Sequence, residues 1–144
     1  MPEKKNLALL ILLALFSAIA IYTLSPRAYY SEKNPILDEI RERFRMIKPE
    51  YAKIPLRTGK SSYTDYKTLI TLCLINPKTQ KYYNINVIMY VALHELAHVI
   101  TKDKEGDDHG PIYKKNFAEL LDIAKEKGVY DARVTIPETY CGIK

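Results

Sequence analysis

Residues 87–100 read VIMYVALHELAHVI, and this stretch decides the fold prediction. Its apolar residues on both sides of the central HELAH favour a helix. His94 and His98 are four positions apart, so on a helix they lie one turn above each other on the same face. Two imidazoles at this spacing can hold one zinc ion, and Glu95 between them can reach a zinc-bound water. The stretch therefore predicts a helix that carries a metal site.

The alternative interpretation of this motif is structural, with two helix histidines that only pack or form hydrogen bonds. Histidine is rare in this chain, with three in 144 residues, and all three lie within the segment 94–109. An HExxH motif on a strongly apolar helix, with the remaining histidine just downstream, favours zinc over packing.

A catalytic zinc usually has three protein ligands and keeps one position open for water. His109 is the first candidate for the third ligand, because ten residues after His98 are enough to reverse the chain. It also comes just before the expected last helix. Glu119, twenty-one positions after His98, is a second candidate, although a solvated helix residue is the simpler interpretation of it. The other candidates are acids of the connecting loop, which are most simply solvated turn residues: Glu105, Asp107 and Asp108.

Such a site predicts peptide hydrolysis. Zinc lowers the pKa of its bound water to about 7 and polarises a carbonyl. Glu95 would take the proton of that water as general base and pass it to the leaving amine. If Asp107 or Asp108 closed the site as a fourth ligand, the domain would instead be a non-catalytic zinc-binding interaction module. Three tyrosines are candidate donors to the oxyanion, although each is more simply an ordinary amphipathic side chain: Tyr113, Tyr130 and Tyr140.

The N-terminus differs in composition from the rest of the chain. Residues 7–24 carry no charge over eighteen positions, which meets the usual threshold for a transmembrane helix. The alternative is a signal peptide cleaved after an A-x-A-like site at 18–20. We expect a single-pass membrane protein, with the domain on the extracytoplasmic side favoured by the lysines that precede the run. The expected organisation is a membrane anchor or signal peptide at 1–26, a linker at 27–33 and a metallopeptidase-like domain at 34–144.

The remaining sequence predicts an α+β domain with a small antiparallel sheet. A helix should begin at Asn34-Pro35, with the asparagine as N-cap, and end before Pro49. Asn86 is a candidate cap of the zinc-motif helix, and a last helix should run from Pro111 to Gly128. An extended peptide substrate would add to the edge of the 81–85 strand or its partner. The expected strands cover 51–57, 66–75, 81–85 and 133–136.

Charge and cysteine content say little about partners. The formal net charge of +5 is mild and spread out, so a nucleic-acid partner is not expected. Two interpretations of Cys73 and Cys141 stay open. They pair as a disulfide if the domain is extracytoplasmic, and Cys73 is simply a small buried residue if it is not.

The motif and its flanks resemble the SprT/Spartan and WLM metallopeptidases. Those small proteases have an HExxH motif, a third histidine in a loop and an aromatic residue shortly after it, as in HELAH followed by HGPIYKKNFAELL here. The likeness covers about residues 66–127. The wider pattern, with YVALHELAHVI, GVYD and a terminal YCGI, is similar to small WLM-like proteins of large DNA viruses.

This resemblance implies a minimal gluzincin-type zincin domain that uses Zn2+ and cleaves a protein or peptide substrate. It makes His94, His98 and His109 the ligands and Glu95 the catalytic group. The chain departs from Spartan in its hydrophobic N-terminus and in lacking a DNA-binding extension, which argues against proteins crosslinked to DNA as substrates. The expected function is a membrane-anchored zinc endopeptidase, and the alternative is a zinc-binding interaction module on the same anchor.

Overall fold

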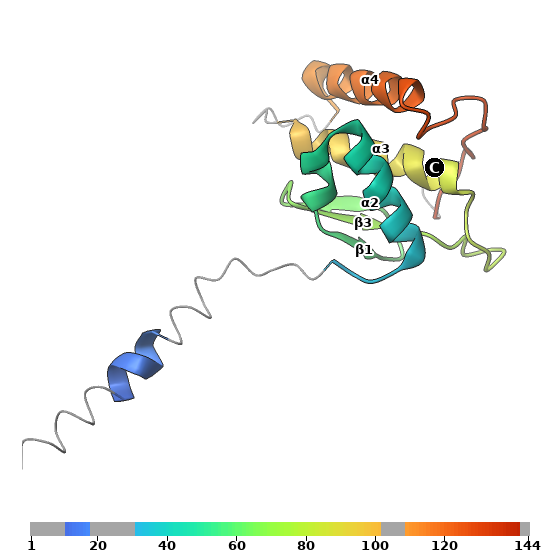
Figure 1. Ribbon diagram of the computed structural model, residues 1–144. Coiled ribbons are helices and arrows are strands. Elements are labelled where there is room, and N and C mark those ends of the chain that lie inside the picture. The colour runs from blue at the N-terminus through green and yellow to red at the C-terminus, as the bar shows by residue number, and fades with distance from the viewer. Residues whose placement is uncertain (1–10, 18–30, 102–108, 142–144) are drawn as a thin grey trace, which may run out of the picture. The chain divides into compact units, whose positions relative to one another are not determined.

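The computed structural model describes residues 11–17, 31–101 and 109–141. The chain divides into two compact units, Met1–Tyr30 and Ser31–Lys144. The second unit is α+β, as the sequence predicts (Figure 1). Its elements are, in chain order, α2 (Pro35–Ile47), the 3-10 helix η1 (Pro49–Lys53), β1 (Leu56–Thr58), β2 (Tyr63–Asp65), β3 (Leu69–Leu72), α3 (Ile85–Ile100) and α4 (Pro111–Glu126).

The prediction of a transmembrane helix over residues 7–24 is wrong for the described part of the chain. Residues 11–17 are helical there, and the rest of the run lies outside the described residues. Across the described ranges, no helix combines the length and the apolar character that a membrane crossing requires. This finding corrects the expected N-terminal transmembrane helix and the expected single-pass membrane location.

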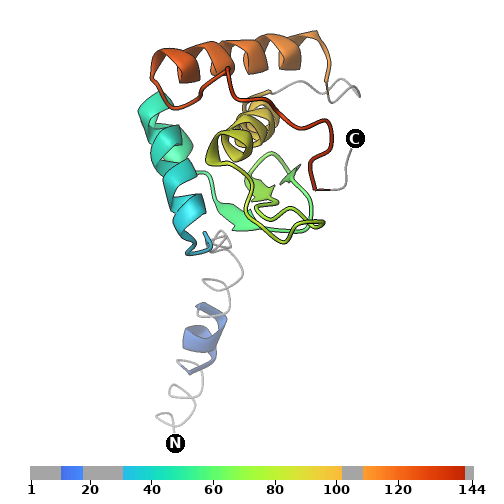
Figure 2. The same ribbon diagram turned by 90° about the vertical axis from the view of Figure 1, so that its right-hand side faces the viewer.

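Helix α3 is the central element of the second unit. It packs against β2 and β3 on one side and against α4 on the other, and it also contacts α2. Figure 2 shows α3 nearly end-on, with α4 above it and the sheet below. A helix enclosed from several directions needs apolar side chains around most of its circumference. This explains the sequence of α3, whose most completely buried side chains are Ile88, Met89, Ala92, Leu93, Leu96 and Ala97.

The sheet has three strands in the order β1-β3-β2, and it is mixed rather than antiparallel as predicted. The central strand β3 pairs in parallel with β1, Leu56 opposite Ile70, and antiparallel with β2, Thr64 opposite Ile70. Every residue of β3 is buried. The apolar run 66–75 therefore does mark a buried strand, but the strand covers only its middle. The partner β2 lies in a segment to which the sequence analysis assigns no strand.

Three other predicted strands are wrong in whole or in part. The first part of the range 51–57 belongs to η1, which begins at Pro49. Only the last two residues of the range belong to β1. In 81–85 a single bridge, Tyr82 to Ile75, replaces the strand. The described segment 133–136 contains no strand.

The predicted helix ends are mostly confirmed. The side chain of Asn34 accepts a hydrogen bond of 2.9 Å from the backbone N–H of Ile36, which caps α2. Gly128, at φ +70°, lies just beyond the end of α4 in the left-handed conformation that glycine tolerates best. The cap of α3 is Asn84 rather than Asn86, since the Asn84 side chain accepts from the Asn86 N–H at 2.8 Å.

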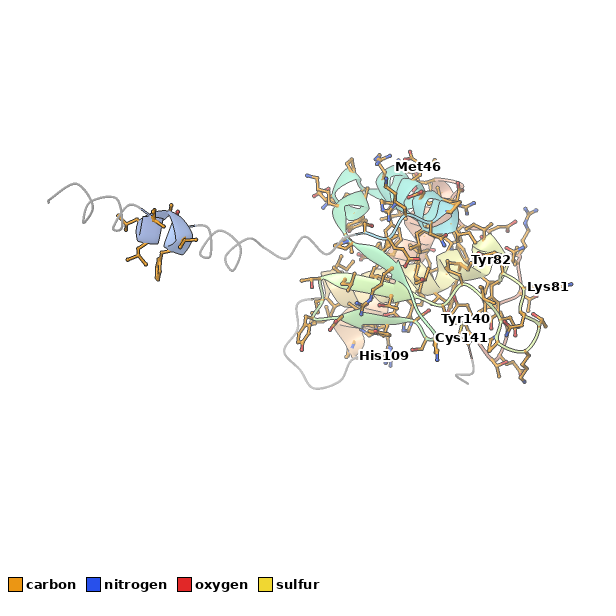
Figure 3. All side chains as sticks on the ribbon, turned by 90° about the horizontal axis from the view of Figure 1, so that it is seen from below. Met46, Lys81, Tyr82, His109, Tyr140 and Cys141 are labelled. Carbon is orange, nitrogen blue, oxygen red and sulfur yellow. A yellow bond between two sulfur atoms is a disulfide. The ribbon has the colours of Figure 1, made fainter. Side chains whose placement is uncertain are left out.

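The segment after α4 returns to the sheet and is tied there (Figure 2). The side chain of the buried Asn86 donates to the Asp131 carbonyl and accepts from the Asp131 N–H, both at 2.7 Å. Further along, Cys141 forms a disulfide with Cys73, with their Cα atoms 6.3 Å apart (Figure 3). The neighbouring Tyr140 hydroxyl donates to the Cys73 carbonyl. The question left open by the sequence is thus resolved in favour of the disulfide.

Candidate metal centre

Three histidines, two from α3 and one from the segment just before α4, lie close together. His94 and His98 project from α3, and His109 lies two residues before α4. One ring nitrogen from each lies within 4.8 Å of the others, close enough for the three to bind one metal ion. The Nε2 atoms of His94 and His109 are 3.3 Å apart. Two nitrogens at the zinc–nitrogen distance of a tetrahedral site would be separated by about 3.3 Å, so the spacing fits a shared ion.

The ring of Tyr113, in the first turn of α4, contacts all three imidazoles. Its centroid lies 5.4 Å from that of His94, 4.4 Å from that of His98 and 4.8 Å from that of His109. Phe117, one turn further along α4, packs edge-on against His94 with centroids 5.4 Å apart. The apolar face of α4 therefore forms the packing surface on which the histidine cluster rests.

The Tyr113 hydroxyl is engaged with His94 rather than directed at a substrate. It lies 2.7 Å from His94 Nδ1 and 3.3 Å from the His94 carbonyl oxygen. When Nδ1–H donates to the hydroxyl and the hydroxyl donates to the carbonyl, Nε2 carries no proton and is the free metal-binding nitrogen. Burial raises the pKa of Tyr113, so the phenol stays protonated and keeps its donor. The Tyr113 hydroxyl therefore bonds to His94, and its predicted oxyanion role stays a prediction.

The protonation of His94 suits a ligand. Burial, together with the neighbouring His98 and His109, lowers the pKa of His94 to about 4. A histidine with this pKa is neutral at pH 7, and the neutral imidazole is the form that donates a lone pair to a metal.

Glu95 lies at the same site and is held by a strand. Only 6% of its surface is exposed. The Thr64 hydroxyl, on β2, lies 2.8 Å from Glu95 Oε2 and 2.9 Å from the Glu95 backbone oxygen, and its proton can be donated to either. Burial raises the pKa of Glu95, and the hydrogen bond from Thr64 opposes that shift. The sequence analysis missed Thr64, because a contact between residues 31 positions apart has no local signal.

A cavity of about 370 Å³ opens onto this cluster. Its floor holds Glu95 and the three histidines, and its wall is β2 with the turn that follows it. The wall residues are Ser62, Tyr63, Thr64, Tyr66 and Lys67. A second cavity, of about 590 Å³ beside the disulfide, contains none of the metal-site residues.

The other candidate site residues that the structure describes do not join the cluster. Glu119 is exposed on α4, where its carboxylate lies 3.8 Å from Lys115 Nζ. Tyr130 packs on Tyr90 with ring centroids 6.0 Å apart, and Tyr140 bonds to Cys73; neither lines the cavity. Burial raises the pKa of Tyr140 to about 12. The remaining candidates, Glu105, Asp107 and Asp108, lie outside the described residues.

Comparison with known proteins finds relatives in viruses. The chain is 37% identical over 84 residues to an uncharacterized protein of Invertebrate iridescent virus 3, covering 58% of this chain and 51% of that protein. It is 38% identical over 92 residues to an uncharacterized protein of Invertebrate iridescent virus 6, covering 62% and 50%. An uncharacterized protein of Acanthamoeba polyphaga mimivirus is 32% identical over 117 residues, covering 79% and 57%. The chain thus spans about half the length of the curated relatives that it matches.

No family model and no solved structure matches the chain. The resemblance to SprT/Spartan and WLM metallopeptidases therefore stays a prediction made from the motif and its flanks. The viral origin of the three relatives agrees with the predicted likeness to viral proteins.

Proposed function

We propose that this chain is a zinc-dependent endopeptidase. The observation that carries the proposal is that ligand nitrogens of three imidazoles lie within 4.8 Å of one another at a cavity that Glu95 also lines. An all-histidine set of three is a donor set that zinc prefers in catalytic sites, because it leaves one coordination position open. The resemblance of the HELAH motif and its flanks to small HExxH proteases supports the same conclusion.

The ligands would be His94, His98 and His109. When bound, zinc would supply Lewis acidity toward a water molecule and a peptide carbonyl. Tyr113 would keep His94 in the tautomer whose Nε2 is free. Glu95, buried and hydrogen-bonded to Thr64, would take the proton of the attacking water and deliver it to the amine of the leaving fragment.

The substrate would be an extended polypeptide that runs along β2. Among the described strands β2 pairs only with β3, so its second edge has no strand partner there, and Tyr63 and Thr64 of this strand line the cavity. An extended chain can add to such an edge through backbone hydrogen bonds, which recognise a polypeptide of many sequences. The proposed substrate edge is therefore 63–65, in place of the 81–85 segment that the sequence suggested.

Metal analysis of the full chain tests this function. We expect one zinc per chain by elemental analysis, and cleavage of an unfolded protein such as reduced casein that stops on chelation and returns with added zinc. His109→Ala should lose both the metal and the cleavage, because two ligands are left for the ion. The matched control is Glu119→Ala, which removes the exposed carboxylate of the rejected ligand candidate and should change neither. A chain that binds zinc and cleaves nothing would instead be a non-catalytic zinc-binding module.

Tyr113→Phe should weaken zinc binding about 10–100-fold, the usual effect of removing a hydrogen bond to a metal-ligating histidine. The ring, and its packing against the three imidazoles, is kept, while the hydroxyl that orients His94 is lost. Competition with a chromogenic zinc chelator measures the affinity. Tyr130→Phe is the control, since that phenol lies outside the cavity wall and floor. Equal affinities for the two variants would contradict the orienting role of Tyr113.

A further inference from the structure

The turn that joins β2 to β3 has an unusual backbone for its sequence. The Thr68 N–H donates to the Asp65 carbonyl at 3.0 Å, and the two residues between them have positive φ, +47° at Tyr66 and +55° at Lys67. Two central residues with positive φ are typical of a type I′ hairpin turn, which Asn-Gly fills with least strain. Tyrosine and lysine are held here in a conformation that L-residues with large side chains disfavour.

The turn is tied to the helix that carries the metal site. Lys67 Nζ donates to the carbonyl of Thr101 at 2.7 Å, and Thr101 is the C-cap of α3. A cation at the carboxyl end of a helix interacts favourably with the helix dipole. From α4, the Asn116 side chain donates to the Thr101 hydroxyl at 3.0 Å. These contacts fix the position of the turn relative to His98, one turn of helix earlier.

Tyr66 is the most exposed tyrosine described at the cavity. Its side chain is 84% exposed although it lines the cavity together with the three histidines. Tyr63, the other exposed tyrosine of the wall, is already engaged, because its hydroxyl accepts from Arg57 Nη2 at 3.0 Å. A large ring that is exposed to water on a strained backbone stabilises neither the core nor the turn. Strain of this kind, retained at the rim of a site, points to a role in binding.

We propose that Tyr66 is a substrate-binding residue that selects an aromatic or large aliphatic side chain of the polypeptide lying along β2. The inference rests on the proposed endopeptidase function. A substrate strand beside 63–65 passes the Tyr66 ring, and aromatic rings pair favourably edge-on or offset with another ring. The Lys67–Thr101 hydrogen bond ties the turn that carries this ring to the end of α3. The substrate class is therefore unfolded polypeptide with a bulky apolar residue near the cleaved bond.

The test uses zinc-loaded full chain and fluorogenic decapeptides that differ at one scanned position, occupied by Phe, Leu or Ser. At one position the wild type should show a higher kcat/KM for Phe than for Ser. In Tyr66→Asn the ratio of these two constants should fall about tenfold, as expected for the loss of one aromatic contact. Asparagine tolerates positive φ, so Tm should rise by about 3 °C in the same variant. Tyr66→Phe should keep the wild-type ratio.

Gln80→Asn is the matched control, because Gln80 also has a positive φ, +55°, and lies outside the metal cavity. It should raise Tm similarly and leave the peptide ratio and zinc content unchanged. A wild-type ratio in Tyr66→Asn, with cleavage intact, would overturn the role of Tyr66 alone. If the zinc-loaded wild type cleaves no peptide, and Glu95→Gln binds none by fluorescence anisotropy, the proposed function falls and this inference with it.

Discussion

Glu95→Gln is expected to lower kcat/KM for peptide cleavage by about 10²–10⁴-fold, the usual contribution of a general base, while one zinc per chain stays bound. The substitution keeps the size of the side chain, and its amide oxygen can still accept from the Thr64 hydroxyl at the position of Oε2. What is lost is the ability to take a proton. A fluorogenic peptide assay and elemental analysis on the same sample measure the two quantities.

Thr64→Val provides the companion measurement, in the pH profile of kcat/KM. The hydrogen bond from Thr64 lowers the pKa of Glu95 against the effect of burial, so removing it should raise that pKa. A base works only when deprotonated, and activity falls as the pH drops through its pKa. The acidic limb of the profile should therefore move to higher pH in Thr64→Val. Full activity of Glu95→Gln would remove Glu95 from the mechanism.

Reduction of the Cys73–Cys141 disulfide is expected to lower the free energy of unfolding by about 4 kcal/mol, from the chain-entropy relation for a loop of this length. The two cysteines are 68 positions apart, so the bond restricts a large part of the unfolded chain. Urea denaturation with and without a phosphine reductant gives the difference directly.

The double variant Cys73→Ala/Cys141→Ala is the control for this measurement. It should unfold at the same urea concentration with and without reductant, close to the reduced wild type. Because the Cys73 side chain is buried, with 3% of its surface exposed, a small additional loss from packing is expected in the variant. Coincident denaturation curves for the oxidised and reduced wild type would show that the bond contributes nothing to stability.

The helices and the histidine cluster were accessible to sequence reasoning because their signals are local. Asn34-Pro35 and Gly128 mark helix ends by their own backbone chemistry. His94 and His98 share a helix face through a spacing that is visible in the sequence. The placement of His109 within 4.8 Å of both follows from a connection of ten residues that reverses the chain.

What the sequence could not supply is mostly contact between distant segments. The parallel pairing of Leu56 with Ile70 depends on how the chain crosses the sheet, which no local pattern records. The hydrogen bond from Thr64 to Glu95 and that between Tyr113 and His94 each join separate elements. The apolar run 7–24 misled for a different reason. Hydropathy reports what a long helix there would prefer as its solvent, whereas no helix among the described residues is both long and apolar enough to cross a membrane.

The disulfide has a consequence for how this chain would respond to nicking. Cys73 and Cys141 close a covalent ring that contains α3, α4 and all four polar groups of the metal centre. A single cut in the backbone anywhere inside that ring leaves the two fragments joined by the disulfide. Such a nicked chain would run as one band on a gel without reductant and as two with it, and its histidines would stay on one covalent molecule.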